Sequence, residues 1–317
     1  MKGFGCLARK SQSRKSSKSQ SGSQKLMVVV LSALATLIGM ILNHFQLLPT
    51  IGQTNPILSH VAQNDLQLDI IDVGQADCLL ITSAKGETML IDAGNRADEE
   101  IILSYLEQKG ISHLNYVVAT HPHEDHIGSM AAIINKIPID IFYLPDVTHT
   151  TATYNAMIEA LERSTIDVRE AYAGVQIPWQ TGKMEFVAPK RYNEYKSLNN
   201  YSAVILLQYE KTNFLFCGDA EKESEEEILT AYNLPQISVL KTGHHGSSTS
   251  SNSSFLSAIR PTIALICCGE NNDYGHPHRE TLQNLNKIGS KIYRSDLHGH
   301  IIITSDGDNL QILTQKE

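Results

Sequence analysis

From residue 66 onward, short apolar runs alternate with amphipathic stretches. Runs with the length and composition of strands lie at 68–73, 78–82, 88–92, 115–120, 140–144, 202–209, 213–217, 238–241 and 262–268, and near Ile301 and Leu310. Apolar positions with helical spacing predict helices over 96–109, 153–162, 221–232, 253–259 and 279–288. Hairpins followed by strand–helix alternation therefore occur twice along the chain.

Two pairs of predicted strands are joined by very short connections. SerAlaLysGlyGlu separates the strands at 78–82 and 88–92, and GluLysThr at 210–212 separates a second pair. Because a hairpin requires antiparallel pairing, a fully parallel sheet does not fit. We expect one α/β domain over 66–317, with two β-layers covered by outer helices.

The chain before residue 66 has a different pattern. Residues 1–25 are rich in Ser, Lys, Gln and Gly, with too little apolar side chain to fold alone. Residues 26–42 carry no charge, and as a helix they would extend about 25 Å, close to the thickness of the bilayer core. We expect a transmembrane anchor over 26–48 and a linker over 49–65, with a cleaved secretory signal and a buried core helix as alternatives.

The charge of the flanking residues predicts the orientation of this anchor. Residues 1–25 hold seven Lys or Arg residues and no acidic residue. Since basic flanks stay on the cytoplasmic side, we expect a disordered cytoplasmic tail and a body on the outer side of the cell membrane, in a single-pass arrangement.

Composition limits the classes of protein that remain. The chain is 42% hydrophobic and 19% charged, which excludes disorder over most of its length, collagen and a multi-span membrane protein. The net charge of −8 includes +7 from residues 1–25, so the body is strongly acidic and unsuited to non-specific attraction to nucleic acid. Five cysteines without paired spacing imply no disulfide framework.

Histidines gather where a predicted buried strand ends. His121, His123, Asp125 and His126 form an HxHxDH run within six residues. In an extended loop, alternate side chains point the same way, so His121 and His123 can hold one metal while Asp125 and His126 face a second. Nitrogen and carboxylate ligands suit Zn²⁺, Mn²⁺ or Fe²⁺, and the absence of Cys disfavours a closed structural zinc site.

Three further polar motifs follow predicted strands. Asp219 follows Gly218 at a strand end, where its carboxylate can bridge two metals or, alternatively, cap the next helix. LysThrGlyHisHisGlySer occupies 241–247, and TyrGlyHisPro occupies 274–277 around His276. Each motif places titratable side chains in a segment that follows a predicted strand.

Together these motifs resemble the metallo-β-lactamase fold of binuclear metallo-hydrolases. The resemblance is closer to the metallo-hydrolase domain of competence DNA-uptake channel proteins, which have similar motifs in the same order. Here the motifs are AspValGlyGlnAlaAspCysLeuLeuIle at 72–81, LeuIleAspAlaGly at 90–94, HxHxDH, AsnAsnTyrSer at 199–202, GlyAsp, LeuLysThrGlyHisHisGlySer at 240–247 and TyrGlyHisPro. The resemblance covers residues 66–310 and implies a four-layer αβ/βα sandwich with metals at one edge.

The resemblance also implies a ligand set for two divalent metal ions, with Zn²⁺ favoured and Mn²⁺ as the alternative. The implied ligands are His121, His123, Asp125, His126, Asp219 as the bridge, and His244 for the second metal. Many members of the wider family supply a third His to the first metal from a position where this chain has Asn199 to Ser202. We therefore expect water or an Asn oxygen to complete that metal, and a mononuclear enzyme is the alternative.

The chemistry of this ligand set predicts roles in hydrolysis. Asp125 would orient the attacking water, and His245 or His276 would act as the general acid. The residues expected to bind an anionic substrate are Asn200, Ser202, Gly246 and Ser247.

The resemblance implies a phosphodiester substrate, which includes DNA, and a basic strip of Lys190, Arg191 and Lys241 could guide it. Hydrolysis of an ester, lactone or amide on the same fold is a second hypothesis. A third is a non-catalytic metal-binding component of a DNA-uptake or envelope complex.

Overall fold

The computed structural model describes residues 65–317, and these residues contain two β-sheets. The first sheet has eight strands in the order β15-β14-β1-β2-β3-β4-β5-β6. Its strands are β1 (Leu66–Ile70), β2 (Leu79–Thr82), β3 (Thr88–Ile91), β4 (Leu114–Val118), β5 (Ile139–Leu144), β6 (Asp167–Glu170), β14 (Ile301–Ser305) and β15 (Leu310–Thr314). The second sheet has seven strands in the order β13-β12-β11-β10-β9-β8-β7. Its strands are β7 (Gln176–Ile177), β8 (Lys183–Ala188), β9 (Val204–Tyr209), β10 (Thr212–Phe216), β11 (Val239–Lys241), β12 (Ile263–Ile266) and β13 (Lys291–Arg294).

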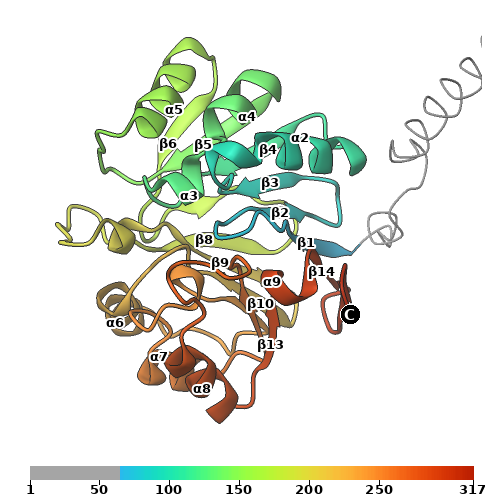
Figure 1. Ribbon diagram of the computed structural model, residues 1–317, viewed down its shortest axis with the longest axis vertical. Coiled ribbons are helices and arrows are strands. Elements are labelled where there is room, and N and C mark those ends of the chain that lie inside the picture. Colours follow the sequence, from blue (N-terminus) through green and yellow to red (C-terminus); the bar gives the residue numbers. More distant parts are fainter. Residues whose placement is uncertain (1–64) are drawn as a thin grey trace, which may run out of the picture. The chain divides into compact units, whose positions relative to one another are not determined.

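Helices lie on the outer face of each sheet (Figure 1). The first half of the domain contributes the 3₁₀ turn η1 (Arg96–Asp98) and the helices α2 (Glu99–Gln108), α3 (Glu124–Ile127), α4 (Met130–Lys136) and α5 (Ala152–Arg163). The second half contributes η2 (Leu198–Tyr201), α6 (Lys222–Ala231), η3 (His244–Gly246), α7 (Ser253–Ile259), α8 (Arg279–Lys287) and α9 (Ser295–His298).

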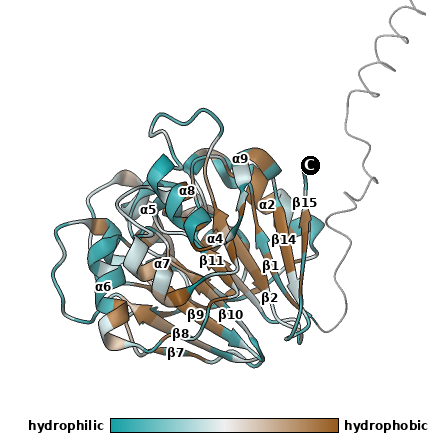
Figure 2. Cartoon of the chain, turned by 90° about the horizontal axis from the view of Figure 1, so that it is seen from below, coloured by the Kyte–Doolittle hydropathy of each residue, from teal (hydrophilic) through white to brown (hydrophobic). Residues whose placement is uncertain are grey.

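Three hydrophobic layers hold this arrangement together. Because successive strand residues face opposite sides of a sheet, Phe214 and Phe216 of β10 pack between the two sheets, while Leu215 packs under the outer helices. Phe142 on β5 likewise faces α4 and α5, whereas its neighbour Tyr143 faces the other sheet. Figure 2 shows the strands as largely hydrophobic and the solvent-facing sides of the helices as hydrophilic. The result is the helix–sheet–sheet–helix sandwich expected from the sequence.

The chain returns to its starting sheet at the end. The strand β14 pairs antiparallel with β1, so that Leu68 lies opposite Ile303, and β15 continues the sheet beyond β14. In Figure 1 the red β14 lies beside the blue β1. The two terminal strands were predicted as strands, but their pairing with the first sheet was not.

The N-terminal predictions lie outside the described residues. The tail over 1–25, the anchor over 26–48 and the linker over 49–65, except for its last residue, all fall there. Over residues 65–317, none of the helices has the length and apolar character needed to cross a membrane.

Candidate metal centre

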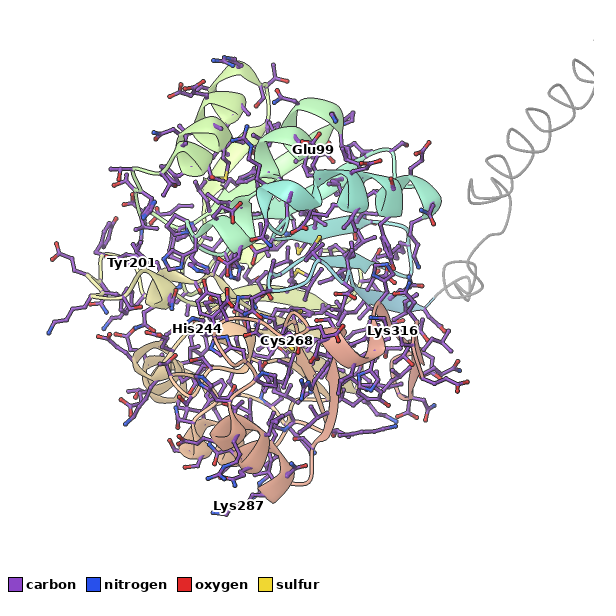
Figure 3. All side chains as sticks on the ribbon, in the orientation of Figure 1. Glu99, Tyr201, His244, Cys268, Lys287 and Lys316 are labelled. Carbon is purple, nitrogen blue, oxygen red and sulfur yellow. The ribbon has the colours of Figure 1, made fainter. Side chains whose placement is uncertain are left out.

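The predicted site residues converge because several strands end at the same edge of the sandwich. The segment after β4 carries His121 and His123 and continues into α3, the segment after β10 carries Asp219, and η3 follows β11. His244 of η3 lies at the seam between the two halves of the domain in Figure 3. Both sheets therefore contribute side chains to one site.

Close backbone packing fixes α3 at this edge. The Asp77 N–H donates to the Asp125 carbonyl at 3.1 Å, and the Ala93 N–H donates to the His126 carbonyl at 2.7 Å. A Cβ on Gly128 would lie 2.2 Å from the backbone of Asn95, so only glycine permits this approach. The Gly that follows the HxHxDH run is thus required by packing.

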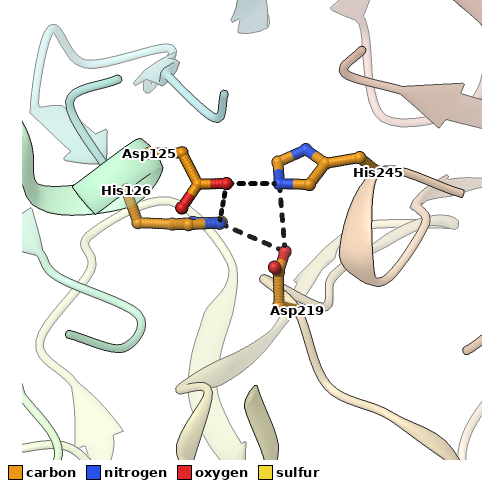
Figure 4. A group of neighbouring side chains, drawn as sticks. All are labelled: Asp125, His126, Asp219 and His245. Atoms are coloured by element: carbon orange, nitrogen blue, oxygen red, sulfur yellow. Dashed lines mark hydrogen bonds and ion pairs between the residues drawn. The ribbon is translucent and has the colours of Figure 1, made fainter. Parts of the chain in front are cut away.

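Four side chains form one compact group at the centre of the site. Asp125, His126, Asp219 and His245 each bring one atom within 4.8 Å of the others (Figure 4). His126 Nε2 lies 3.2 Å from Asp219 Oδ1 and 4.0 Å from Asp125 Oδ2. His245 Nε2 lies 3.2 Å from Asp125 Oδ2 and 3.6 Å from Asp219 Oδ1. Two imidazole nitrogens and two carboxylate oxygens therefore alternate around a common point.

A second group shares Asp219 with the first. His121, His123 and Asp219 also meet within 4.8 Å. His121 Nε2 lies 2.9 Å from His123 Nδ1 and 3.8 Å from Asp219 Oδ2. Burial, together with the charge of His126, holds the pKa of His121 well below its usual range. A neutral His121 presents a lone pair, which suits a metal ligand.

The donor atoms of the first group fit a divalent cation. His126 Nε2 and Asp219 Oδ1 are both buried and have no hydrogen-bond partner. The Nδ1 atoms of both histidines face hydrogen-bond acceptors outside the group. His126 Nδ1 lies 2.7 Å from Asp92 Oδ2, and His245 Nδ1 lies 2.9 Å from the Cys267 carbonyl oxygen. With the protons on Nδ1, both Nε2 lone pairs face the carboxylates, as in carboxylate–histidine–metal arrangements.

The electrostatics of the metal-free group also favour positive charge. Although burial opposes ionisation, His126 and His245 keep the pKa of Asp219 well below its usual range. Burial alone would lower the pKa of His245, but Asp219 and Asp77 raise it to about 10. Asp219, Asp92 and Asp125 similarly raise the pKa of His126. A divalent ion would take the place of these protons, since metal ligands must be deprotonated.

A buried ion pair lies next to His245 of the four-residue group. The Lys241 ammonium donates to Asp77, and both side chains are 1% exposed. Burial opposes the charge of Asp77, but Lys241 and His245 lower its pKa to about 2. Asp77 Oδ1 in turn lies 3.4 Å from His245 Nδ1. Lys241 is therefore a structural partner of the site, and its predicted place in an exposed basic strip was wrong.

The site opens into a cavity of about 590 Å³. His276 lies on its wall, and its proton is positioned by a chain of hydrogen bonds. The Gly269 N–H donates to Gln75 Oε1 at 3.0 Å, which turns Gln75 Nε2 toward His276 Nδ1 at 3.3 Å. Nδ1 then accepts a hydrogen bond, so Nε2 carries the proton. Burial, with His244 and His245 nearby, lowers the pKa of His276 to about 4, so this ring is neutral at pH 7.

The structure places His245, and not its neighbour His244, in the compact four-residue group. It is His245, 1% exposed, that joins Asp125, His126 and Asp219, and not His244 as expected. Both residues have left-handed backbone angles, with φ of 48° at His244 and 51° at His245, so the turn sends their side chains to different sides. Buried among the potential ligands, His245 is not placed as a general acid.

The four residues expected to bind substrate lie behind the site, outside the set that lines the cavity. Ser202 Oγ accepts from the Asp219 N–H at 3.0 Å, and Asn200 Oδ1 accepts from the Glu221 N–H at 3.0 Å. The Gly246 carbonyl accepts from the His278 N–H, and the Ser247 N–H donates to the His244 carbonyl. The polar groups of these four residues therefore form hydrogen bonds that fix the turns carrying the potential metal ligands.

Sequence reasoning missed several residues on the cavity wall. They are Gln75, Asn95, Glu124, His149, Thr151 and Tyr274. Gln75 and Tyr274 belong to motifs that carried the family resemblance, so a signal was present for them. His149 follows β5 in an irregular segment, where no pattern indicated that it approaches His123, with ring centroids 6.3 Å apart.

The fold and this site together define the class of protein. The chain belongs to the metallo-beta-lactamase superfamily, whose sequence pattern matches residues 71–270. Members of this superfamily are typically metal-dependent hydrolases, and the fold binds divalent metal ions. The family resemblance stated from the motifs is confirmed.

Among curated proteins, the chain is similar to three competence and recombination proteins. It is 26% identical over 252 residues to ComE operon protein 3 of Bacillus subtilis, a match covering 74% of this chain and 32% of that protein. It is 29% identical to Recombination protein 2 of Haemophilus influenzae, a match covering 78% of this chain and 30% of that protein. It is also 29% identical to Competence protein ComA of Neisseria gonorrhoeae, a match covering 75% of this chain and 32% of that protein. The chain spans about a third of the length of these relatives.

A solved structure shows the same fold. CmlA, a diiron β-hydroxylase from Streptomyces venezuelae, has a TM-score of 0.51 to this chain at 12% identity. The match covers 81% of this chain and 55% of that chain. At this level of identity the likeness concerns the fold alone.

Proposed function

We propose that this protein is a metal-dependent phosphodiesterase. The observation that carries the proposal is the position of Asp219, whose carboxylate is shared by two groups of potential ligands beside an open cavity. Divalent cations held by these two groups would stabilise both the attacking and the leaving oxygen of a displacement at phosphorus.

The side chains around the cavity supply the remaining chemistry. Divalent ions bound by these groups would lower the pKa of a water molecule and neutralise charge on the substrate. Asp125 is 30% exposed and faces both the ligand group and the cavity, so its carboxylate can accept a hydrogen bond from the attacking water and orient it. His276, neutral and with its proton on Nε2, can donate a hydrogen bond that stabilises charge developing on the leaving oxygen, which is then protonated by water.

The charges around the cavity favour a diester over a monoester. Within the described part of the chain, the residues that line the cavity include no Lys or Arg, while Glu124 and Asp125 add carboxylates. A phosphomonoester dianion would meet no fixed cation beyond the metals, whereas a diester carries a single charge. The name of one relative, a recombination protein, supports DNA as the polymer that contains this diester.

Purified residues 65–317 are the material for the test, because both sheets and all three hydrophobic layers lie within them. The protein, loaded with Zn²⁺ or Mn²⁺, is assayed on bis-p-nitrophenyl phosphate, single-stranded DNA and p-nitrophenyl acetate, with Asp125→Asn as the matched control. Metal-dependent cleavage of the first two supports the proposal. Cleavage of the acetate alone favours an ester hydrolase, and metal binding without any cleavage favours a non-catalytic binding component.

We also propose that residues 26–48 anchor the chain in the cell membrane with its folded domain on the outer side. The basic residues of 1–25 and the uncharged run after them motivate this arrangement. Protease added to intact cells should then degrade the domain and leave a small N-terminal fragment. Protection of the domain, or a mature protein starting near residue 60, would contradict the proposal.

A further inference from the structure

The two oxygens of Asp219 face different partners. Oδ1 lies 3.2 Å from His126 Nε2 and 3.6 Å from His245 Nε2. Oδ2 lies 3.8 Å from His121 Nε2 and 3.8 Å from His244 Nε2. The carboxylate thus separates the histidines into two pairs, and His244 falls on the side of His121.

Polar groups surround both nitrogens of the His244 ring. Nδ1 lies 3.0 Å from Thr249 Oγ1 and 3.4 Å from Glu221 Oε1, and Asn199 Nδ2 lies 3.3 Å from Nδ1 and 3.5 Å from Nε2. With its proton on Nδ1, facing Glu221, the ring presents a lone pair on Nε2 toward Asp219 Oδ2. A divalent cation would satisfy both of these acceptors.

The backbone couples His244 to the turn that carries Asp219. The His244 N–H donates to the Gly218 carbonyl at 3.1 Å. A Cβ on Gly243 would lie 2.5 Å from the Ala220 carbonyl oxygen, so the two turns pack without intervening side chains. The His244 side chain is 24% exposed, whereas that of His121 is 0% exposed. His244 therefore approaches the site from the cavity side.

We propose that His244 is the third histidine of the first metal, together with His121, His123 and Asp219. The compact three-residue group does not include His244, and its partly exposed ring has room to close on an ion. Glu221 and Thr249 orient it from behind. The chain thereby supplies, from a different turn, the histidine that is absent from the segment 199–202.

Asn199 has a supporting position in this arrangement. Its Nδ2 donates to Glu221 Oε1 at 3.3 Å, the same oxygen that faces His244. A residue of the segment 199–202, where the family resemblance implies a third histidine, thus helps to hold the Glu221 carboxylate that faces His244. This inference rests on the metal centre of the proposed function, and not on its reaction.

The test measures metal binding by the full chain without substrate. Metal-free protein is titrated with Co²⁺ by calorimetry and by visible absorption, which reports the coordination of each ion. His244→Asn is the main variant, because Asn tolerates the left-handed backbone angle at this position. We expect one of the two ions to bind at least about tenfold more weakly and the other to be unchanged. Glu221→Gln should weaken the same ion, and His245→Ala should weaken the other one.

His149→Ala is the matched control, since His149 also lines the cavity but belongs to neither ligand group. Equal melting temperatures of the metal-free proteins exclude a folding defect. Unchanged affinity for both ions in His244→Asn would overturn the proposal, as would loss of the same ion in His244→Asn and His245→Ala. Loss of the first ion in Asn199→Ala, with normal binding in His244→Asn, would make the Asn oxygen the ligand instead. None of these outcomes depends on hydrolysis, so they are distinct from a failure of the proposed activity.

Discussion

His126 Nε2 and Asp219 Oδ1 face each other at 3.2 Å, both buried and both without a hydrogen bond. His126 lies on α3 beneath the first sheet, and Asp219 follows β10 of the second sheet. A cation between them therefore joins the two halves of the sandwich as well as the two ligand groups.

Asp219→Asn should consequently affect both metals at once. Loss of the shared charge should lower affinity for each ion by at least about tenfold, whereas Asp125→Asn should weaken only the ion held with His126 and His245. Metal content by mass spectrometry checks the first point. Since a ligand at 100 times its Kd stabilises the folded state by about 2.7 kcal/mol, Asp219→Asn should also lose most of the metal-dependent shift in melting temperature. Two tightly bound ions in this variant would contradict the shared position.

Gln75→Leu should slow phosphodiester cleavage without changing metal content. Gln75 acts through His276, because its amide donates to Nδ1 and so keeps the ring proton on Nε2. Without Gln75 the ring can carry its proton on either nitrogen, although the ring itself stays in place. We expect kcat to fall roughly tenfold, and about 10²-fold or more in His276→Ala, where the donor is gone. If the two residues form one unit, the double variant should be no slower than His276→Ala. Additive losses would mean that Gln75 acts in some other way.

Lys241→Met should be strongly destabilising although it changes no ligand. It leaves the Asp77 carboxylate buried without its counterion, which costs about 3–5 kcal/mol. Adding Asp77→Asn should restore part of this loss, because the uncompensated charge disappears. Urea unfolding of the metal-free proteins measures both effects. Lys222→Met is the control: its pair with Glu226 is exposed and worth about 0.3–0.5 kcal/mol.

Glu225 makes stability depend on pH. Its carboxylate accepts hydrogen bonds from the Ser251 and Asn252 backbone N–H groups, yet burial raises its pKa from 4.5 to about 7. The folded state therefore keeps a proton between pH 4.5 and 7 that the unfolded state has lost. The free energy of unfolding should fall by about 3 kcal/mol as pH rises through this window.

The variant Glu225→Gln isolates this effect. A Gln side chain does not titrate, so the difference in unfolding free energy between wild type and variant should change by about 3 kcal/mol between pH 5 and 8. Urea unfolding of metal-free protein at each pH provides the measurement. A difference that is constant with pH would show that Glu225 is already ionised at pH 5.

Periodicity predicted most of the regular elements. The helix expected at 253–259 coincides with α7, and those expected at 153–162 and 279–288 match α5 and α8 to within a residue. The helix α4 and the strands β6, β7, β8 and β13 were not predicted. In β6, three of the four residues are exposed, so no apolar alternation marks it as a strand. The pairing of β14 with β1 was also missed, since no local pattern specifies which of two sheets a late strand joins.

The site was predicted in its composition but not in its detailed geometry. Spacing brought together His121, His123, Asp125 and His126, because a short loop and one turn of helix place them locally. It did not distinguish His244 from His245, since two successive left-handed residues break the alternation that spacing arguments assume. Lys241 was misjudged because its partner Asp77 is remote in sequence.

The place of β14 between β15 and β1 has a consequence for synthesis on the ribosome. The strand β1 is among the first parts of the domain to be made, yet one of its edges stays unpaired until β14 has been made. Unpaired edges recruit other strands. The nascent domain thus remains open to aggregation until translation is nearly complete, and a premature stop before residue 301 leaves that edge permanently exposed.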